Sequence, residues 1–208
     1  MTEDVAALIE SNVAEFLLAM GKTGGGTERA DEEVTWTVGG SPIAYHNAVV
    51  RCDASESRGA ELVDLPPIEG LEIATVRSTP DLEDYRSVLA AGFGETPKEA
   101  DWVASIYSKP GVATDGPWRH IVGRVDEEPV ATASLLLTGT TGGIYFVCVR
   151  PEFRRRGCGA SITHRAMTEA ARSGATLGVL GSSPMGQHVY ERLGFRTVFS
   201  YRLFEFEP

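Results

Sequence analysis

The sequence contains few cysteines and histidines, and neither residue type is spaced as a set of metal ligands. Its three cysteines, Cys52, Cys148 and Cys158, are odd in number and form no C-x-x-C pair, and its four histidines are scattered along the chain. Structural zinc sites need such ligands in close pairs. We therefore expect no disulfide framework and no metal site.

Long apolar runs are also missing. No segment approaches the roughly 20 apolar residues that a membrane-spanning helix needs, and Glu3 and Asp4 stand where a signal peptide carries basic residues. The 208 residues are 42% hydrophobic and 23% charged, which is enough for a sizeable core. We expect a cytoplasmic globular protein that does not contact membranes.

Positive charge is in deficit, and the deficit is uneven. The formal net charge is −10. Residues 1–70 contain 13 acidic and 4 basic residues, whereas residues 71–208 contain 16 and 15. Nucleic-acid binding requires a basic face, so this balance argues against a nucleic-acid partner. An acidic N-terminal third could steer a cationic substrate or could serve solubility alone.

One stretch of the sequence predicts an anion-binding loop. Residues 154–160 read Arg-Arg-Arg-Gly-Cys-Gly-Ala, and they lie between an apolar strand at residues 144–149 and a helical pattern. Glycines at 157 and 159 allow a tight turn, and the start of the next helix presents backbone N–H groups and a positive dipole end. Guanidinium groups can bind phosphate bidentately. We expect the ligand to be highly charged, such as a diphosphate.

Two common phosphate-binding motifs do not match these residues. A nucleoside-triphosphate P-loop requires a lysine after its glycines, and none is present. A dinucleotide-binding fold requires a third glycine, and position 162 is isoleucine. Both alternatives therefore fail on residue identity.

Two segments together resemble the signatures of the GNAT acetyltransferases. Residues 147–159 read Val-Cys-Val-Arg-Pro-Glu-Phe-Arg-Arg-Arg-Gly-Cys-Gly, similar to the family's acetyl-coenzyme A motif, [Q/R]-x-x-G-x-[G/A] after a hydrophobic strand. Residues 189–195, Val-Tyr-Glu-Arg-Leu-Gly-Phe, are similar to its late hydrophobic-Tyr-x-x-Leu-Gly-Phe element. The resemblance covers about residues 70–208 and implies a GNAT fold, a mixed α/β sheet, with acetyl-coenzyme A as acyl donor.

The resemblance also implies roles for particular residues. The backbone of Phe146, Val147, Cys148 and Val149 would pair with the pantetheine arm, and Tyr190 would protonate the leaving thiolate. The pyrophosphate would be held by the loop residues Arg154, Arg155, Arg156, Gly157, Cys158, Gly159 and Ala160. The acetyl group would pass directly to a primary amine of a small molecule or peptide, without an acetyl-enzyme.

Several points remain open at the level of sequence. Many GNAT members carry Asn and Ala seven and four residues before the tyrosine, where this chain has Ser183 and Gly186. Ser183 could still hydrogen-bond near the pantetheine, but a catalytically weak acyl-coenzyme A-binding module is an alternative function. Ser182, Ser183 and Tyr145 are weak candidates for the general base.

We interpret Cys148 and Cys158 as structural residues rather than nucleophiles, and His188 as an exposed residue, because none of the three fits a catalytic position.

The periodicity of residues 71–208 predicts alternating strands and helices. Strands are expected at 71–77, 120–125, 130–137, 143–149, 177–181 and 196–204. Helices are expected at 78–89, 97–107, 160–172 and 185–193.

The N-terminal third predicts a separate acidic segment, residues 1–65, before a GNAT domain at 66–208. Residues 4–20 have apolar residues at helical spacing. Residues 33–38 and 43–52 read as two strands joined in a hairpin by Gly39-Gly40-Ser41-Pro42. This segment weakly resembles a reduced first half of tandem GNAT proteins, and we expect it to form part of the acceptor wall, to make a homodimer contact or only to stabilise the fold.

Overall fold

The computed structural model describes residues 5–23, 27–30, 35–38, 46–53, 65–93, 96–109, 112 and 116–202. The helices are α1 (Val5–Thr23), α2 (Thr79–Phe93), α3 (Pro97–Tyr107), α4 (Cys158–Arg172) and α5 (Pro184–Arg192), with a 3-10 turn at Pro151–Phe153. The strands are β1 (Thr27–Ala30), β2 (Thr35–Val38), β3 (His46–Asp53), β4 (Leu71–Thr75), β5 (Trp118–Val125), β6 (Glu128–Thr138), β7 (Thr141–Val149), β8 (Leu177–Ser182) and β9 (Arg196–Arg202).

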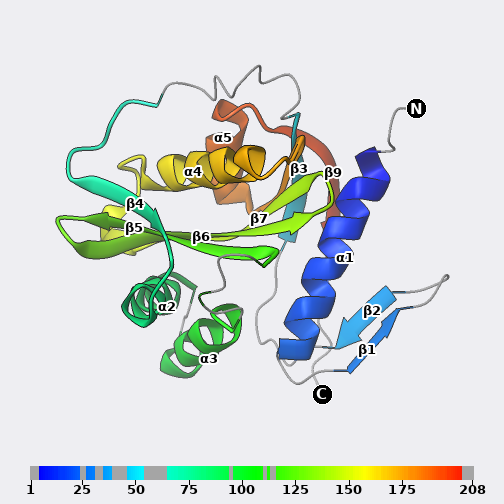
Figure 1. Cartoon of the computed structure of the whole chain (residues 1–208), viewed down its shortest axis with the longest axis horizontal. Coiled ribbons are helices and arrows are strands. Elements are labelled where there is room, and N and C mark those ends of the chain that lie inside the picture. Colours follow the sequence, from blue (N-terminus) through cyan, green and yellow to red (C-terminus); the bar gives the residue numbers. More distant parts are fainter. Residues whose placement is uncertain are drawn as a thin grey trace.

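A seven-stranded mixed sheet in the order β4-β5-β6-β7-β8-β3-β9 forms the centre of the molecule. Its neighbouring strands are antiparallel except for β7 and β8, which run parallel. Helix α4 lies on one face of this sheet, and α2 and α3 lie on the other (Figure 1). The mixed α/β fold class expected from the sequence is confirmed.

Two adjacent glycines of β7 show how closely helices approach both faces. A Cβ atom on Gly142 would lie 2.7 Å from Cβ of Ala170 in α4, and one on Gly143 would lie 2.0 Å from Oδ1 of Asn12 in α1. Successive residues of a strand point to opposite faces. Helix α1 therefore lies on the face opposite α4, which is the face that α2 covers.

The expected elements of residues 71–208 are confirmed, with ends that differ by a few residues. The apolar side of α4 faces the sheet as its periodicity predicts, since Ile162, Ala166 and Met167 are buried. Gly174 ends this helix with φ of +90°, a conformation that glycine adopts without strain.

The predicted N-terminal hairpin is wrong. Strand β2 pairs with β1, which precedes it, and β3 lies in the main sheet between β8 and β9. The glycines and proline at 39–42 suggested local pairing, but an interior position gives β3 backbone hydrogen bonds on both sides and leaves β8 without a free edge there. The division of the chain at residue 65 stays a prediction. Strand β3 precedes this residue in the sequence but belongs to the sheet whose other strands all follow it.

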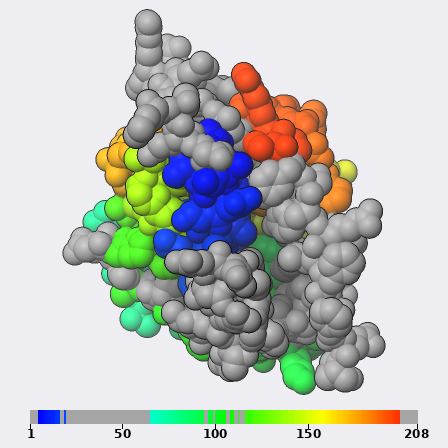
Figure 2. Space-filling view, turned by 90° about the vertical axis from the view of Figure 1, so that its right-hand side faces the viewer, coloured from blue at the N-terminus to red at the C-terminus, as the bar shows by residue number. Residues whose placement is uncertain are grey.

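Helix α1 is attached to the sheet by apolar and polar contacts. Ile9 is buried against Leu177 and Val179 of β8. The amide of Asn12 is also buried, and its Nδ2 donates to Oγ1 of Thr138 at 2.7 Å. Figure 2 shows α1 in blue at the centre of the face that it covers. The expectation that the N-terminal helix packs on the sheet is confirmed.

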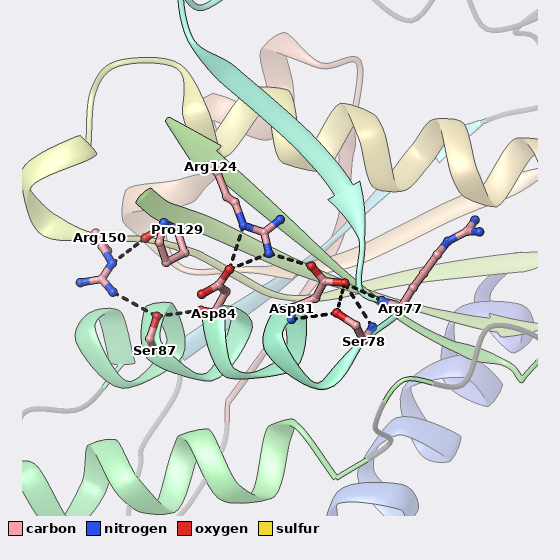
Figure 3. A network of polar contacts seen from close by, with 8 residues as sticks. All are labelled: Arg77, Ser78, Asp81, Asp84, Ser87, Arg124, Pro129 and Arg150. Atoms are coloured by element: carbon pink, nitrogen blue, oxygen red, sulfur yellow. Dashed lines mark hydrogen bonds and ion pairs between the residues drawn. The ribbon is translucent and has the colours of Figure 1, made fainter. Parts of the chain in front are cut away.

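Helix α2 is held against β5 by a charged cluster (Figure 3). The guanidinium of Arg124 donates to Oδ2 of Asp84 from Nε at 2.8 Å, and its second nitrogen contacts Oδ1 of Asp81 at 2.8 Å. Asp81 also accepts from the backbone N–H of Ser78 at 3.1 Å, just before the helix begins. These contacts link the start of α2 to the sheet strand behind it.

Candidate functional site

The parallel pairing of β7 and β8 ends before either strand ends. The last matched pair is Ile144 with Leu180, yet β7 continues to Val149. On the side facing β8, no described strand pairs with residues 145–149. This part of β7 therefore offers backbone groups to which an extended ligand could add like a strand.

A β-bulge interrupts β7 at the same point. Ser134 of β6 pairs with Tyr145, but Thr132 pairs with Cys148, so Phe146 and Val147 together face one residue of β6. Phe146 has φ of +52°, which non-glycine residues rarely adopt. Its carbonyl accepts from Oγ1 of Thr132 at 3.1 Å. Such bulges redirect backbone and side-chain groups and are frequent next to active sites.

The Gly-x-Gly loop leads from the end of β7 into α4. Gly157 is the N-cap residue with φ of +89°, Arg155 has φ of +61°, and no side chain caps the helix. The first N–H groups of an α-helix have no acceptor within the helix. The loop therefore presents uncapped backbone donors at a positive helix end, as the sequence predicts for an anion site.

The two glycines differ in their room for a side chain. A side chain at Gly157 would be strained by the positive φ and would lie 3.2 Å from Cδ1 of Ile68. A Cβ at Gly159 would make an ordinary contact of 3.5 Å with Val149. The fold itself thus has room for a Cβ atom at 159.

The three arginines of the loop differ in the contacts that their side chains make. Nε of Arg154 donates to the carbonyl of Val149 at 3.1 Å, which supports the end of β7. Arg156 lies over the ring of Phe153 at 5.0 Å, and Arg155 is exposed. Of the three, Arg155 is therefore the most available to an incoming phosphate.

A fourth arginine, Arg150, holds the junction between β7 and the loop. Its Nε donates to the carbonyl of Pro129 at 2.7 Å and a terminal nitrogen donates to Oγ of Ser87 at 3.1 Å (Figure 3). This residue orients the strand end from which the loop starts.

Tyr190 of α5 is buried, with only 9% of its surface exposed. Its ring meets that of Phe195 edge to face at 6.0 Å. Burial, with a smaller contribution from the nearby Cys148, raises the pKa of Tyr190 to about 12. The hydroxyl makes no hydrogen bond to any residue in the described part of the chain. It therefore stays protonated at neutral pH and can act as a hydrogen-bond donor.

The serines after β8 are engaged within their own turn. Oγ of Ser183 accepts from the N–H of Gly186 at 3.3 Å and caps α5, and Oγ of Ser182 donates to the carbonyl of Ser183 at 2.8 Å. The hydroxyl of Tyr145 donates to Oδ1 of Asn12 at 2.5 Å. None of the three base candidates is poised as a free proton acceptor.

Cys148 and Cys158 are buried, as expected for structural residues. Burial raises the pKa of Cys148 to about 12 and also raises that of Cys158. Cys148 donates to the carbonyl of Val88 at 3.5 Å. A thiolate is disfavoured at both positions. His188 is exposed, as expected.

Sequence reasoning missed three residues beside this site. Phe16 and Trp118 lie against the β7 bulge, and the buried Asn12 binds Tyr145. Asn12 interrupts the apolar stripe of its helix, which was the available signal. The aromatic residues are too far apart in the sequence to suggest a contact.

In the described part of the chain, no helix is long and apolar enough to cross a membrane. No group of three or more potential metal-binding side chains is found among the described residues either.

Comparisons with known proteins agree with this geometry. Residues 116–197 match the sequence family described as the acetyltransferase (GNAT) domain. The match includes β7, the Gly-x-Gly loop, α4 and α5. No curated protein matches the sequence.

Solved structures of GNAT proteins share the fold at low identity. A GCN5-related N-acetyltransferase from Kribbella flavida aligns with a TM-score of 0.58 and 20% identity, covering 76% of this chain and 56% of that one. A GCN5-related N-acetyltransferase from Sphaerobacter thermophilus gives 0.57 and 18%, covering 77% and 51%. AAC(6')-Iy, solved with a bisubstrate analogue of coenzyme A and acetylneamine, gives 0.52 and 16%, covering 66% and 97%.

This chain thus spans little more than half the length of the Kribbella and Sphaerobacter proteins. Residues 116–197 thus match the GNAT acetyltransferase domain family, and the chain shares its fold with solved GNAT proteins.

Proposed function

We propose that this protein transfers the acetyl group of acetyl-coenzyme A to a primary amine of a small molecule or peptide, by direct attack within a ternary complex. The observation that carries the proposal is the part of β7 that continues beyond its last pair with β8. It leads from the bulge at Phe146 to the uncapped start of α4. A thioester held there has its phosphates and its acyl group at opposite ends of one continuous backbone surface.

The donor would bind along this surface. The pantetheine amides would hydrogen-bond to the backbone of residues 146–149, and the pyrophosphate would accept from the N–H groups of residues 157–160. The exposed Arg155 would add a charge-assisted contact. This places the thioester at the bulge, where a backbone N–H can stabilise the carbonyl oxygen as it gains charge.

The reaction needs no nucleophile from the protein. A neutral amine attacks the thioester carbon, the C–N bond forms and the C–S bond breaks, and the amine loses one proton while the thiolate gains one. Tyr190 would donate the proton to sulfur. Because its pKa is about 12, transfer to a thiolate is uphill unless the proton released by the amine replaces it. The two proton movements are therefore coupled in this proposal.

Gly159→Val tests the donor site. The protein accommodates a Cβ at this position, but the larger side chain would block the approach of the pyrophosphate to the backbone. We expect acetyl-coenzyme A affinity to fall about 100-fold, roughly 3 kcal/mol. Calorimetry on the folded variant measures this. Ala171→Val, near the other end of α4, is the control and should bind normally, and unchanged affinity in Gly159→Val would remove the basis of the proposal.

A second function is favoured by Ser183. Its hydroxyl caps α5 where many GNAT members carry asparagine, so a contact to pantetheine is weaker. A catalytically weak acyl-coenzyme A-binding module would bind the donor without releasing thiol. A thiol-release assay with acetyl-coenzyme A and a panel of primary amines separates the two functions, because only a transferase gives release that depends on the amine.

A further inference from the structure

Four aromatic side chains meet beside the bulge of β7. The ring centroids of Trp118, Tyr145 and Phe146 form a triangle with sides of 6.1, 6.4 and 6.4 Å. The ring of Phe16 stacks on Tyr145 at 3.9 Å and lies 5.6 Å from Phe146 and 6.3 Å from Trp118. All four side chains remain partly exposed, so they do not form a closed core.

This aromatic cluster lies where the acyl end of the donor would be. Two of its members, Tyr145 and Phe146, are the first residues of β7 beyond the last pair with β8. The anion loop follows the other end of this part of β7, after Val149. A donor with its phosphates on that loop therefore presents its thioester to the cluster.

Helix α1 is positioned so that Phe16 is a fixed part of the cluster. Asn12, one turn earlier on the same face, accepts from the hydroxyl of Tyr145 at 2.5 Å and donates to Thr138 at 2.7 Å. Gly143 permits this approach, because a Cβ there would lie 2.0 Å from Oδ1 of Asn12. Phe16 therefore reaches the site from outside the segment that matches the GNAT family.

The cluster has a definite chemical preference. None of its four side chains carries a charge, and the hydroxyl of Tyr145 is already bonded to Asn12. Aromatic faces attract apolar groups and also ammonium groups. A carboxylate partner would strongly stabilise the ammonium form of the amine, whereas the uncharged rings attract it more weakly and so oppose loss of the proton less. Sugar-like amines would leave many hydroxyl groups without partners here.

We propose that Phe16, Trp118, Tyr145 and Phe146 form the acceptor subsite, that Phe16 of the N-terminal helix determines its selectivity, and that the acceptor is a primary amine on an apolar body. This assignment rests on the proposed acetyl transfer for its choice of substrate class. Amine binding can nevertheless be measured without turnover.

The test is calorimetry on the full chain saturated with coenzyme A, which cannot donate an acetyl group. Phenethylamine is the apolar probe and glucosamine the hydroxylated one. We expect phenethylamine to bind at least about tenfold more tightly than glucosamine, and Phe16→Ala to remove most of this difference. Val13→Ala is the matched control, because Val13 lies on the same helix but packs toward β8. It should leave phenethylamine affinity within about twofold.

Two results overturn the proposal: wild-type protein that does not prefer phenethylamine, and equal losses in Phe16→Ala and Val13→Ala, which indicate a purely structural role. Thiol release is measured in parallel. Thiol release with glucosamine but not with phenethylamine would contradict the proposed acceptor subsite and support acetyl transfer. If phenethylamine binds in a way that depends on Phe16 but no amine causes thiol release, the acceptor subsite is supported and acetyl transfer is contradicted.

Discussion

At the scale of single residues, Tyr190 links the family resemblance to the observed site. It is buried in α5, yet its hydroxyl has no partner among the described residues. Burial that raises its pKa to about 12 keeps the proton on oxygen at neutral pH. A hydroxyl that keeps its proton and bonds no described residue is able to donate to a ligand atom.

Tyr190→Phe removes the hydroxyl and keeps the ring packed against Phe195. We expect the maximal rate to fall about 10²-fold while the affinity for acetyl-coenzyme A stays nearly constant. Since the tyrosine does not titrate below its pKa, the wild type should show no loss of rate from its ionisation between about pH 6 and 10. Steady-state kinetics across this range provides the measurement, and wild-type turnover in the variant would assign Tyr190 to structure alone.

His120 should control the stability of the fold in mild acid. It is 2% exposed, its Nδ1 lies 2.7 Å from Oγ of Ser134, and its Nε2 has no hydrogen-bond partner among the described residues. Burial lowers its pKa to about 4 from 6.5. Between these values the unfolded chain binds the proton and the native state does not, so the free energy of unfolding decreases as pH falls from 6.5 to 4.

The lowered pKa of His120 should decrease the free energy of unfolding by roughly 3 kcal/mol over this pH range. Urea unfolding at several pH values measures it, with His120→Gln as the comparison. The glutamine variant should lose most of the pH dependence in this window. An identical slope in both proteins would show that other groups cause it.

At the scale of elements, β3 is the feature that sequence reasoning misplaced. Ala48 pairs with Ser182 on one side and Ser200 on the other, so a proline there removes a hydrogen bond from an interior strand. We expect Ala48→Pro to destabilise the protein by about 3 kcal/mol or more. Ala30→Pro in the two-stranded β1–β2 sheet is the control and should cost less. Denaturant unfolding measures the loss of stability in both variants. Equal losses would contradict the placement of β3 in the interior of the sheet.

At the scale of the whole molecule, the N-terminal and C-terminal parts should unfold together. Strand β3 lies between β8 and β9, and α1 packs on β7 and β8. Loss of either part exposes unpaired backbone in the other. We expect one unfolding transition with a calorimetric enthalpy equal to the van't Hoff enthalpy. Two separate transitions would instead support an independent domain at residues 66–208.

The fragment 66–208 offers a direct comparison. It lacks β3, so β8 loses its antiparallel neighbour and β9 loses its attachment to the sheet. We expect this fragment to be insoluble or to lack cooperative unfolding by circular dichroism. A fragment that folds and binds acetyl-coenzyme A would show that the strand is dispensable.

The sequence by itself determined the features that depend on local order. The period of two in strands, the period of 3.6 in helices and the glycines at 157 and 159 are local signals, so they predicted the elements of residues 71–208 and the loop before α4. The two family signatures also predicted the GNAT domain. Adjacent residues carry each of these signals, and tertiary packing only adjusted the ends of the elements.

Tertiary structure alone decided which distant segments pair. The pairing of β3 with β8 and the stacking of Phe16 on Tyr145 join residues more than 100 positions apart, and the pairing of β7 with β8 ends at Ile144 and Leu180, which lie on separate elements. Several apolar strands of similar composition could occupy an interior position in the sheet. One sequence does not show which of them buries the most apolar surface while all its backbone groups form hydrogen bonds. The order of the strands therefore depends on the free energy of the whole sheet.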